Sequence, residues 1–379
     1  MHPDPRARTF LRLLLFLLMT LQAAAATDLV FVGTYTRTSS RGIYLVRLDR
    51  ETGALSEATL AAETANPSFL TLSPDHKFLY AVSETEAMAA AFAADIATGQ
   101  LRPLEAPQSS GGAAPCHLVV DPTQRALVIA NYHTGIVAAI PIRPDGRLGA
   151  PNVVAHSGHS VNPERQSSPH VHSVTLSPDG RFVIVCDLGL DRIFTYALDA
   201  GRAALSPASP PFAATVLGSG PRHFAFGRNG RQGYALTEMG NTVTAYDYEA
   251  ATGKLTPRQT LPTLPAEFKG ASTGAEIRVH PNGRFLYTSN RGHDSIAVFA
   301  IDGTTGLLTP VQITPCGGKN PRNFALSPDG RWLVCANQNS DTLTVLQVDP
   351  ASGRLKLTPH SIAVALPVCV LFAPGTGPL

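Results

Sequence analysis

A two-part pattern recurs along almost the whole of this 379-residue chain. Its first part is an apolar run, a turn resembling Pro-Asp-Gly and a second apolar run. Six copies occur, with turn positions at Pro74, Pro122, Pro178, Arg228, Pro281 and Pro328. Repeats of about 50 residues are typical of folds built from identical supersecondary units, so the pattern restricts the fold before composition is considered.

The second part of the pattern alternates apolar and polar residues and then turns at a glycine into another strand, as β-hairpins do. Seven copies place this glycine at Gly53, Gly99, Gly146, Gly201, Gly253, Gly306 and Gly353. Two hairpins per repeat make a four-stranded blade. The sequence therefore predicts an all-β, seven-bladed β-propeller of four-stranded antiparallel blades, in one domain over residues 27–379.

One inner strand is missing from the first series and is found at the far end of the chain. The segment PVCVLFAP (367–374) matches PRNFALSP (321–328) at its Pro, Phe and Pro positions. We therefore expect the C-terminal strand to pair with LVFVGTY (29–35) in the N-terminal blade. Such a closure removes the unpaired strand edges that an open ring would expose.

The first 26 residues have the pattern of a Sec-type signal peptide. Arg6, Arg8 and Arg12 precede an apolar run at residues 13–21, and small residues follow up to Ala26. The run is shorter than the roughly 20 residues of a membrane-spanning helix. We expect cleavage near Ala26 and no stable membrane insertion afterwards, with an uncleaved anchor as the alternative. The mature chain would be secreted, and periplasmic in a Gram-negative host.

Charge and cysteine content narrow the function. The net charge is +2 and no long basic run occurs, so the sequence predicts no nucleic-acid partner but is compatible with a small anion. The five cysteines are scattered and odd in number, unlike a disulfide framework. No Cys or His spacing resembles a zinc site. We expect a monomer that binds a small molecule, with no predicted cofactor or bound metal; assistance by a divalent cation stays open.

The candidate site follows from where the repeat breaks down. In a propeller the innermost strand lines the channel, and its start lies on the same face as the end of the next antiparallel strand. Solvated blade positions should repeat, but here they differ from blade to blade and concentrate charge, which predicts a site at one channel mouth. The candidates are His117, His170, His172, Arg222, His223, Glu238, Glu276, Arg291, Arg322 and Gln338.

These residue types suit acid–base chemistry on an anion, because imidazoles and carboxylates transfer protons and guanidiniums clamp carboxylate or phosphate. Other interpretations stay open. His170 and His172 could bind a metal or hydrogen-bond to neighbouring blades. Glu238 and Arg291 could form an inter-blade ion pair, and the two aspartates of DLGLDR could bind a cation or support a turn. No GxSxG elbow supports a Ser-His-Asp triad.

Several segments resemble the bacterial lactonase family of seven-bladed propellers. They are FVGTYT, PCH, SPHVHS, CDLGLDR, GPRHFAF, GAEIRVHPNGRFLYTSNRGHDSIAVF and NFALSPDGRWLVCANQNSDTLTV. That family includes propeller-type 6-phosphogluconolactonases and fungal 3-carboxy-cis,cis-muconate lactonizing enzymes. The resemblance covers about residues 29–372, and the stretch SNRGHDSIAVF is its most specific part.

The resemblance implies hydrolysis of a sugar-derived, anionic lactone without an organic cofactor. By motif it implies active residues at His172 (or His170), Arg222, Glu238 and Arg291. His172 or Glu238 would then activate water or relay its proton, while the two arginines hold the anionic group and stabilise the oxyanion.

Other functions remain as alternatives. One is a carboxymuconate-type lactonizing activity, and another is a non-catalytic, ligand-binding propeller. A binding scaffold would not need His172, Arg222, Glu238 and Arg291 to converge on one cavity. Export would favour an unphosphorylated aldonolactone or an aromatic-derived lactone over a cytosolic sugar phosphate.

Overall fold

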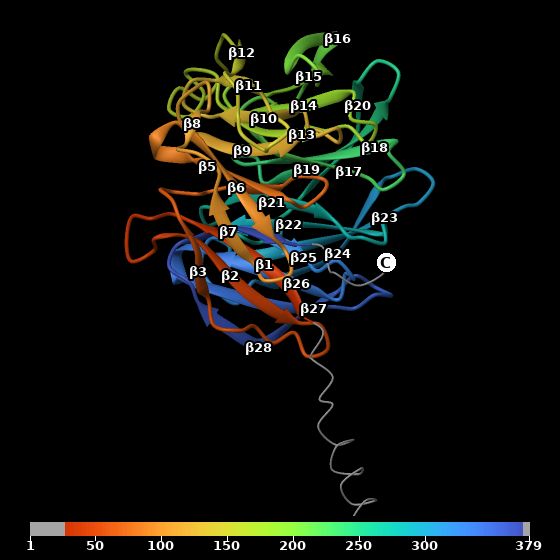
Figure 1. Ribbon diagram of the computed structural model, residues 1–379. Helices are drawn as coiled ribbons and strands as arrows, with labels where there is room; N and C mark the ends of the chain where they lie inside the picture. The colour runs from red at the N-terminus through yellow and green to blue at the C-terminus, as the bar shows by residue number, and fades with distance from the viewer. Residues whose placement is uncertain (1–26, 374–379) are drawn as a thin grey trace, which may run out of the picture.

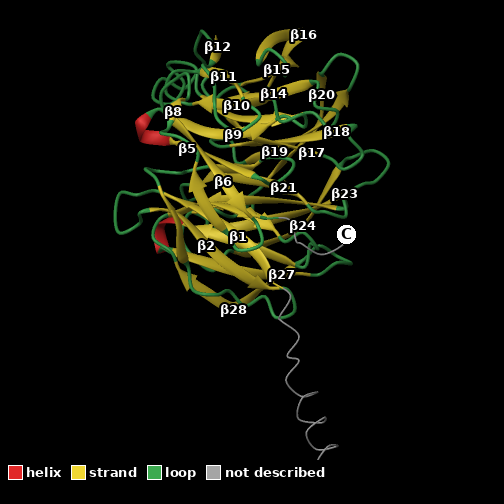
Figure 2. Cartoon of the chain, in the orientation of Figure 1, coloured by secondary structure: helices red, strands yellow, loops and turns green. Residues whose placement is uncertain are grey.

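A computed structural model describes residues 27–373 of the chain and confirms the predicted propeller. Seven antiparallel sheets form the blades, and their innermost strands contact one another in a ring (Figure 1). The described residues contain no α-helix, only the short 3₁₀ helices η1 (Glu84–Glu86) and η2 (Gln338–Ser340), on one side of the view in Figure 2. The predicted signal peptide lies outside the described residues. Within them, no helix has the length and apolarity to cross a membrane.

Each blade runs outward from the channel through four strand positions. The innermost strands are β4 (Leu70–Leu72), β9 (Pro115–Val120), β13 (Val171–Leu176), β17 (Pro221–Phe226), β21 (Thr273–Val279), β25 (Pro321–Leu326) and β29 (Pro367–Phe372). The second strands are β1 (Thr27–Thr34), β5 (Phe78–Ser83), β10 (Ala126–Asn131), β14 (Phe182–Asp187), β18 (Gln232–Thr237), β22 (Phe285–Arg291) and β26 (Trp332–Asn337).

The third strands are β2 (Gly42–Asp49), β6 (Met88–Asp95), β11 (Ile136–Pro141), β15 (Arg192–Asp199), β19 (Thr242–Glu249), β23 (Ser295–Ile301) and β27 (Thr342–Val348). The outer strands are β3 (Thr59–Glu63), β7 (Gln100–Pro103), β12 (Asn152–Ala155), β16 (Ala204–Ala214), β20 (Lys254–Pro262), β24 (Leu308–Pro315) and β28 (Leu355–Ala363). One blade has a divided outer edge, because β7 and the two-residue β8 (Gln108–Ser109) both pair with β6.

The ring closes as predicted. β29 pairs antiparallel with β1, with Val370 opposite Val32, so both ends of the described chain share one sheet. The backbone N–H of Val370 also donates to Asn323 Oδ1 of β25 at 2.8 Å. The closing strand is therefore bonded to the blades on both of its sides.

The recurring Ser-Pro-Asp-Gly motif makes the tight turn from an inner strand to the second strand. In the blade of β13, Ser177 Oγ donates to Asp179 Oδ1 at 2.6 Å and accepts from the N–H of Phe182 at 2.9 Å. Gly180 follows at φ +70°, a left-handed conformation that glycine adopts without a Cβ clash. The same turn chemistry recurs at Ser327 and Asp329, which explains why the repeat can be recognised in sequence.

Glycines of the second series hold adjacent blades together. The Tyr80 hydroxyl donates to the carbonyl of Gly146 in the next blade at 3.0 Å, and Tyr287 bonds Gly353 in the same way at 2.9 Å. A Cβ on Gly146 would lie 2.4 Å from the ring of Phe78, so only glycine permits this approach. Contacts of this kind bury the second strands between blades and leave the outer strands exposed.

β-Bulges lie at the start of several inner strands, at one mouth of the channel. In the blade of β13, Val171 pairs with Asp187 and Ser173 with Cys186, so His172 is the extra, unpaired residue. Bulges bend a strand locally and redirect a side chain. The corresponding unpaired residues are Cys116, His172, Arg222, Arg322 and Val368.

Candidate active site

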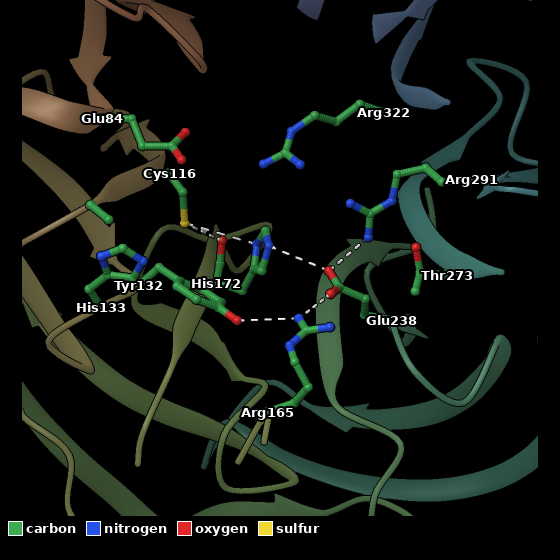
Figure 3. A pocket seen from close by; sticks show the side chains of 11 residues that line it. Glu84, Cys116, Tyr132, His133, Arg165, His172, Glu238, Thr273, Arg291 and Arg322 are labelled. Atoms are coloured by element: carbon green, nitrogen blue, oxygen red, sulfur yellow. Dashed lines mark hydrogen bonds and ion pairs between the residues drawn. The ribbon is translucent and has the colours of Figure 1, made fainter. Parts of the chain in front are cut away.

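A cavity of about 320 Å³ opens at this channel mouth (Figure 3). Charged and polar side chains from several blades point into it, as the sequence predicted for this face. Its lining residues are Glu84, Ala114, Cys116, Tyr132, His133, Arg165, His172, Glu238, Thr273, Arg291 and Arg322. The volume lies at the small end of the range typical of ligand pockets, about 300–1,000 Å³.

Glu238, just after β18, is the centre of the charge cluster. Its Oε1 accepts from Arg165 Nη2 at 2.5 Å, and its Oε2 lies 3.1 Å from Arg222 Nε and 2.9 Å from Arg291 Nη2. Burial alone would raise the pKa of Glu238, but the neighbouring charges, led by Arg291, hold that pKa well below its usual range. Glu238 is therefore ionised at neutral pH and fixes three guanidiniums around one carboxylate.

His172 lies beside this cluster as a neutral imidazole. Its Nε2 is 3.8 Å from Glu238 Oε2, and its Nδ1 is 4.0 Å from the sulfur of Cys116. Burial, reinforced by the charge of Arg222, lowers the pKa of His172 well below its usual range. The ring is thus unprotonated at neutral pH, and neither of its nitrogens is within 3.5 Å of these neighbours, so it can accept a proton from a bound water.

Cys116 also lines the cavity, but its environment suits a thiol rather than a thiolate. Its sulfur donates to the backbone carbonyl of His172 at 3.2 Å. Burial raises the pKa of Cys116, while burial lowers that of His172, so the pair does not favour the thiolate–imidazolium form that a nucleophilic cysteine needs. All five cysteines are buried and free.

Sequence reasoning missed Arg165, which lies on the segment 156–170 between β12 and β13. Its Nη2 contacts both Glu238 Oε1 and, at 3.4 Å, the hydroxyl of Tyr132. The segment is well tethered: Gln166 is fully buried and donates to the carbonyl of Leu188 at 2.8 Å. Its length was the available signal, since long connections in compact repeats often carry function.

Arg322 and Glu84 form another part of the wall. Glu84 Oε2 accepts from the Tyr35 hydroxyl at 2.9 Å. The guanidinium of Arg322 lies 5.5 Å from the Tyr35 ring and points into the open cavity (Figure 3). Glu84 and Tyr132 were not among the predicted site residues, although both follow the second strand of their blade at the position that identified Glu238.

The structure separates the two histidines of SPHVHS. His172 lines the cavity, whereas the ring of His170 stacks on Tyr132 at a centroid distance of 4.4 Å, and its Nδ1 hydrogen-bonds to the carbonyl of Tyr132 at 3.0 Å. His170 therefore supports the wall from behind. Within residues 27–373, no three His, Cys, Asp or Glu side chains are grouped so that they could hold a metal ion. The His-x-His pair therefore has no third metal ligand among these residues.

Arg222 contacts the cluster but is only 2% exposed and is not among the cavity-lining residues. Its Nη1 donates to the carbonyl of Ala275 and lies 3.1 Å from His223 Nε2. The geometry makes Arg222 a support for Glu238 rather than a direct contact to a ligand.

Three predicted residues line a different cavity of about 300 Å³ further along the channel, whose walls are mostly apolar: His117, His223 and Glu276. His223 Nδ1 is 3.1 Å from Glu276 Oε1, and His117 packs on the ring of Phe69 at a centroid distance of 4.0 Å. These three residues are close in sequence to residues at the first cavity but do not line it.

Gln338 and the two aspartates of DLGLDR lie outside both cavities. Gln338 begins η2 outside the cavity lining and accepts a hydrogen bond from Asn320 Nδ2 at 3.2 Å. In DLGLDR, Asp187 accepts from the N–H of His170 and Asp191 from the N–H groups of Gly218 and Gly220. These bonds join the two aspartates to other segments; within the turn itself, Asp187 Oδ1 accepts from the N–H of Leu190 at 3.2 Å, as the turn-supporting interpretation expects.

Of the predicted catalytic group, His172, Glu238 and Arg291 line one cavity and Arg222 contacts Glu238 directly behind them. The four positions found by counting along separate blades are thus brought together. Glu238 and Arg291 do form the inter-blade ion pair considered above, but this pair faces the cavity.

Comparison with known proteins identifies the family of the chain. Residues 29–372 match the family model "Lactonase, 7-bladed beta-propeller". The chain is 38% identical to a 6-phosphogluconolactonase of Bacillus subtilis over 90% of this chain and 97% of that protein. It is 32% identical to a 6-phosphogluconolactonase of Formosa agariphila over 78% of this chain and 86% of the other.

A solved structure is similar over nearly its whole length. The periplasmic gluconolactonase of Pseudomonas aeruginosa superposes with a TM-score of 0.87 at 35% identity, covering 92% of this chain and 99% of that one. The propeller, the charged cavity and these relatives lead to one conclusion. The chain belongs to the lactonase family of seven-bladed β-propellers and is a carboxylic-ester hydrolase.

Proposed function

We propose that the protein hydrolyses a sugar-derived lactone of the 6-phosphogluconolactone type in the cavity around His172 and Glu238. The observation that carries this proposal is the pairing of a neutral imidazole with a carboxylate-anchored group of arginines in one pocket. The relatives named as 6-phosphogluconolactonases and gluconolactonase support the substrate class.

In the proposed reaction, His172 removes a proton from a bound water as the water oxygen attacks the lactone carbonyl carbon. Arg291, which faces the cavity, stabilises the negative charge that develops on the carbonyl oxygen. Burial lowers the pKa of Arg291 to about 10, so it keeps its charge at neutral pH. The ring C–O bond then breaks, and His172 returns the proton to the leaving ring oxygen, giving a hydroxy acid.

Glu238 and Arg222 have supporting roles in this mechanism. Because Glu238 is held ionised by three guanidiniums, it is a poor proton acceptor and a good anchor for Arg291. Arg222 contacts Glu238 Oε2, the oxygen that Arg291 also contacts, from the side away from the cavity. This arrangement keeps Arg291 fixed before substrate binds, which is the condition for effective oxyanion stabilisation.

We also propose that the reaction takes place outside the cytosol, in a monomeric enzyme. The signal-like pattern of residues 1–26 and the similarity to a periplasmic gluconolactonase support this location. The natural substrate would then be a lactone that reaches the periplasm.

The test is an acid-release assay on a panel of aldonolactones, with and without phosphate, run on the purified mature protein. His172→Asn should lower kcat about 10²- to 10⁴-fold, the usual contribution of a general base. A chelator added to a parallel series reports whether a divalent cation assists.

The pH profile separates a base from a merely structural histidine. Wild-type kcat should stay constant as the pH is lowered past 6.5 and fall only near the lowered pKa of His172. The residual activity of His172→Asn should not show this fall. His360→Asn on β28, far from the cavity, is the matched control. Full activity in His172→Asn, or no lactonase activity in the wild type, would contradict the proposal.

A further inference from the structure

Arg322 differs from the other arginines of the cavity in having no carboxylate partner. Arg165, Arg222 and Arg291 all contact Glu238. Within residues 27–373, the guanidinium of Arg322 forms neither a hydrogen bond nor an ion pair, and its described neighbour is the ring of Tyr35. Its donors are therefore available to a ligand.

The cavity as a whole carries excess positive charge. Four guanidiniums in and behind the wall face two carboxylates, and His172 is neutral: Arg165, Arg222, Arg291 and Arg322 against Glu84 and Glu238. The three arginines at Glu238 share a single negative charge. Glu84 already accepts two contacts from the Tyr35 hydroxyl. This excess favours the binding of an anion, and Arg322 is the arginine of the four that no carboxylate of the described residues contacts.

Arg322 is also built to stay charged and in place. Burial alone would lower its pKa, but nearby groups, led by Tyr35 and Glu84, raise that pKa overall. The residue is the unpaired position of the bulge in β25, between Pro321 and Asn323, which directs it to the channel mouth. Arg322 is half-buried, and a partly desolvated cation without an ion-pair partner is costly unless an anion pairs with it.

We propose that Arg322 is the specificity-determining residue that binds an anionic substituent of the lactone, a phosphate or a carboxylate, and so selects charged over neutral lactones. This inference rests on the proposed function. The ester end of the substrate would lie at His172 and Arg291, and the charged end at Arg322. A guanidinium fork matches the paired oxygens of either group. The proposal replaces the expectation that Arg222 binds the anionic group, because Arg222 already donates to Glu238 and to the carbonyl of Ala275.

The experiment compares three lactones on wild type, Arg322→Gln and the control Arg258→Gln. Arg258 is on the outer strand β20, where it pairs with the exposed Asp247. The substrates are glucono-1,5-lactone, its 6-phosphate, and a glucarolactone that carries a carboxylate at the same end. We expect wild type and the control to prefer the charged lactones, and Arg322→Gln to lose about 30-fold in kcat/KM on them, mainly through KM. Its kcat/KM on the neutral lactone should stay within about twofold.

Other outcomes each have a meaning. A loss on the phosphate but not the carboxylate, or the reverse, identifies which anion Arg322 recognises. An equal loss on all three lactones would make Arg322 part of the catalytic machinery and overturn the proposal. No loss on any of them, or a wild-type preference for the neutral lactone, would overturn it as well.

A binding measurement keeps the test independent of turnover. Inorganic phosphate should raise the Tm of wild type and of Arg258→Gln, and Arg322→Gln should show less than half of that shift. If no lactone is hydrolysed by the wild type, the proposed function fails, and this measurement still decides whether Arg322 binds anions. An undiminished phosphate shift in Arg322→Gln would then reject the anion site.

Discussion

At the scale of single residues, the site places a charged carboxylate beside a neutral imidazole, with Glu238 Oε2 at 3.8 Å from His172 Nε2. Glu238 is buried yet ionised, because Arg165, Arg222 and Arg291 surround it. His172 is buried and neutral, because desolvation and Arg222 both disfavour its protonated form. Both pKa values are lowered, so at neutral pH the carboxylate is charged and the imidazole neutral, which are the protonation states that an anchor and a general base need.

Cys116 offers a direct test of which neighbour of His172 takes part in catalysis. We predict that Cys116→Ala keeps kcat within about threefold of the wild type, since burial raises the pKa of this thiol and removes its value as a nucleophile. Iodoacetamide should likewise leave the wild-type rate unchanged.

The same assay run on His172→Asn provides the contrast, because that variant should lose most of its turnover. If Cys116→Ala instead lost activity to the level of His172→Asn, or if an acyl-enzyme accumulated on the thiol, a covalent mechanism would replace attack by water.

At the scale of elements, the inner strands do more than line a channel. A bulge at their second residue sets Cys116, His172, Arg222 and Arg322 apart from the regular pairing of the ladder. In a regular strand, successive side chains alternate between faces. The bulge interrupts this alternation at the channel mouth, and this interruption sets the direction of the four side chains.

The closing strand β29 is an element whose contribution can be measured. Val370 is 2% exposed and packs in a cluster with Val30, Val32 and Val334 across the junction of the chain ends. We predict that Val370→Ala lowers the free energy of unfolding by about 2 kcal/mol, from lost burial and the small cavity left behind. Urea denaturation checks it.

Leu357→Ala is the matched control for the closure, since Leu357 lies on the outer strand β28 and is 42% exposed. It should change the free energy of unfolding by no more than about 0.5 kcal/mol. Equal effects of the two substitutions would mean that β29 does not contribute to a closed ring in solution.

At the scale of the whole molecule, the channel holds several imidazoles that folding keeps uncharged. The pKa values of His117, His172 and His223 are all lowered well below their usual range, with burial as the largest cause in each. In the unfolded chain these groups return to ordinary values near 6.5. Unfolding therefore takes up protons at mildly acidic pH.

Stability should consequently fall as the pH is lowered below about 6.5. Each histidine that is neutral when folded and protonated when unfolded adds a slope of about 1.4 kcal/mol per pH unit to the free energy of unfolding. The loss continues until the pH reaches the lowered pKa of the folded state. Glu238, whose folded pKa is also lowered, adds its own loss only below about pH 4.5.

Urea titrations between pH 8 and pH 5 measure this dependence. The slope below pH 6.5 should be shallower in His223→Asn, which removes one of the three groups. A free energy of unfolding that is constant from pH 8 to pH 5 would show that these imidazoles are not neutral in the folded protein.

Much of the fold was readable from the sequence, because a blade is made from contiguous residues. Each hairpin carries its own turn chemistry, such as Ser177, Asp179 and Gly180, and its own alternation, so the number of blades follows from local pattern alone. The closing strand could be found because it repeats the pattern of β25. Counting from the turns also located His172, Glu238 and Arg291, since equivalent positions in a repeat have equivalent places in space.

Only the tertiary structure decided which candidates share a cavity. Arg222 and His223 are adjacent in one strand, yet a bulge that propensity does not predict directs Arg222 to Glu238 and leaves His223 with Glu276. Arg165 enters the site from a connecting segment whose course depends on contacts to other blades. The sequence by itself determined the blades because their interactions are local; the tertiary structure decided the cavity because its walls join side chains from blades far apart in the chain.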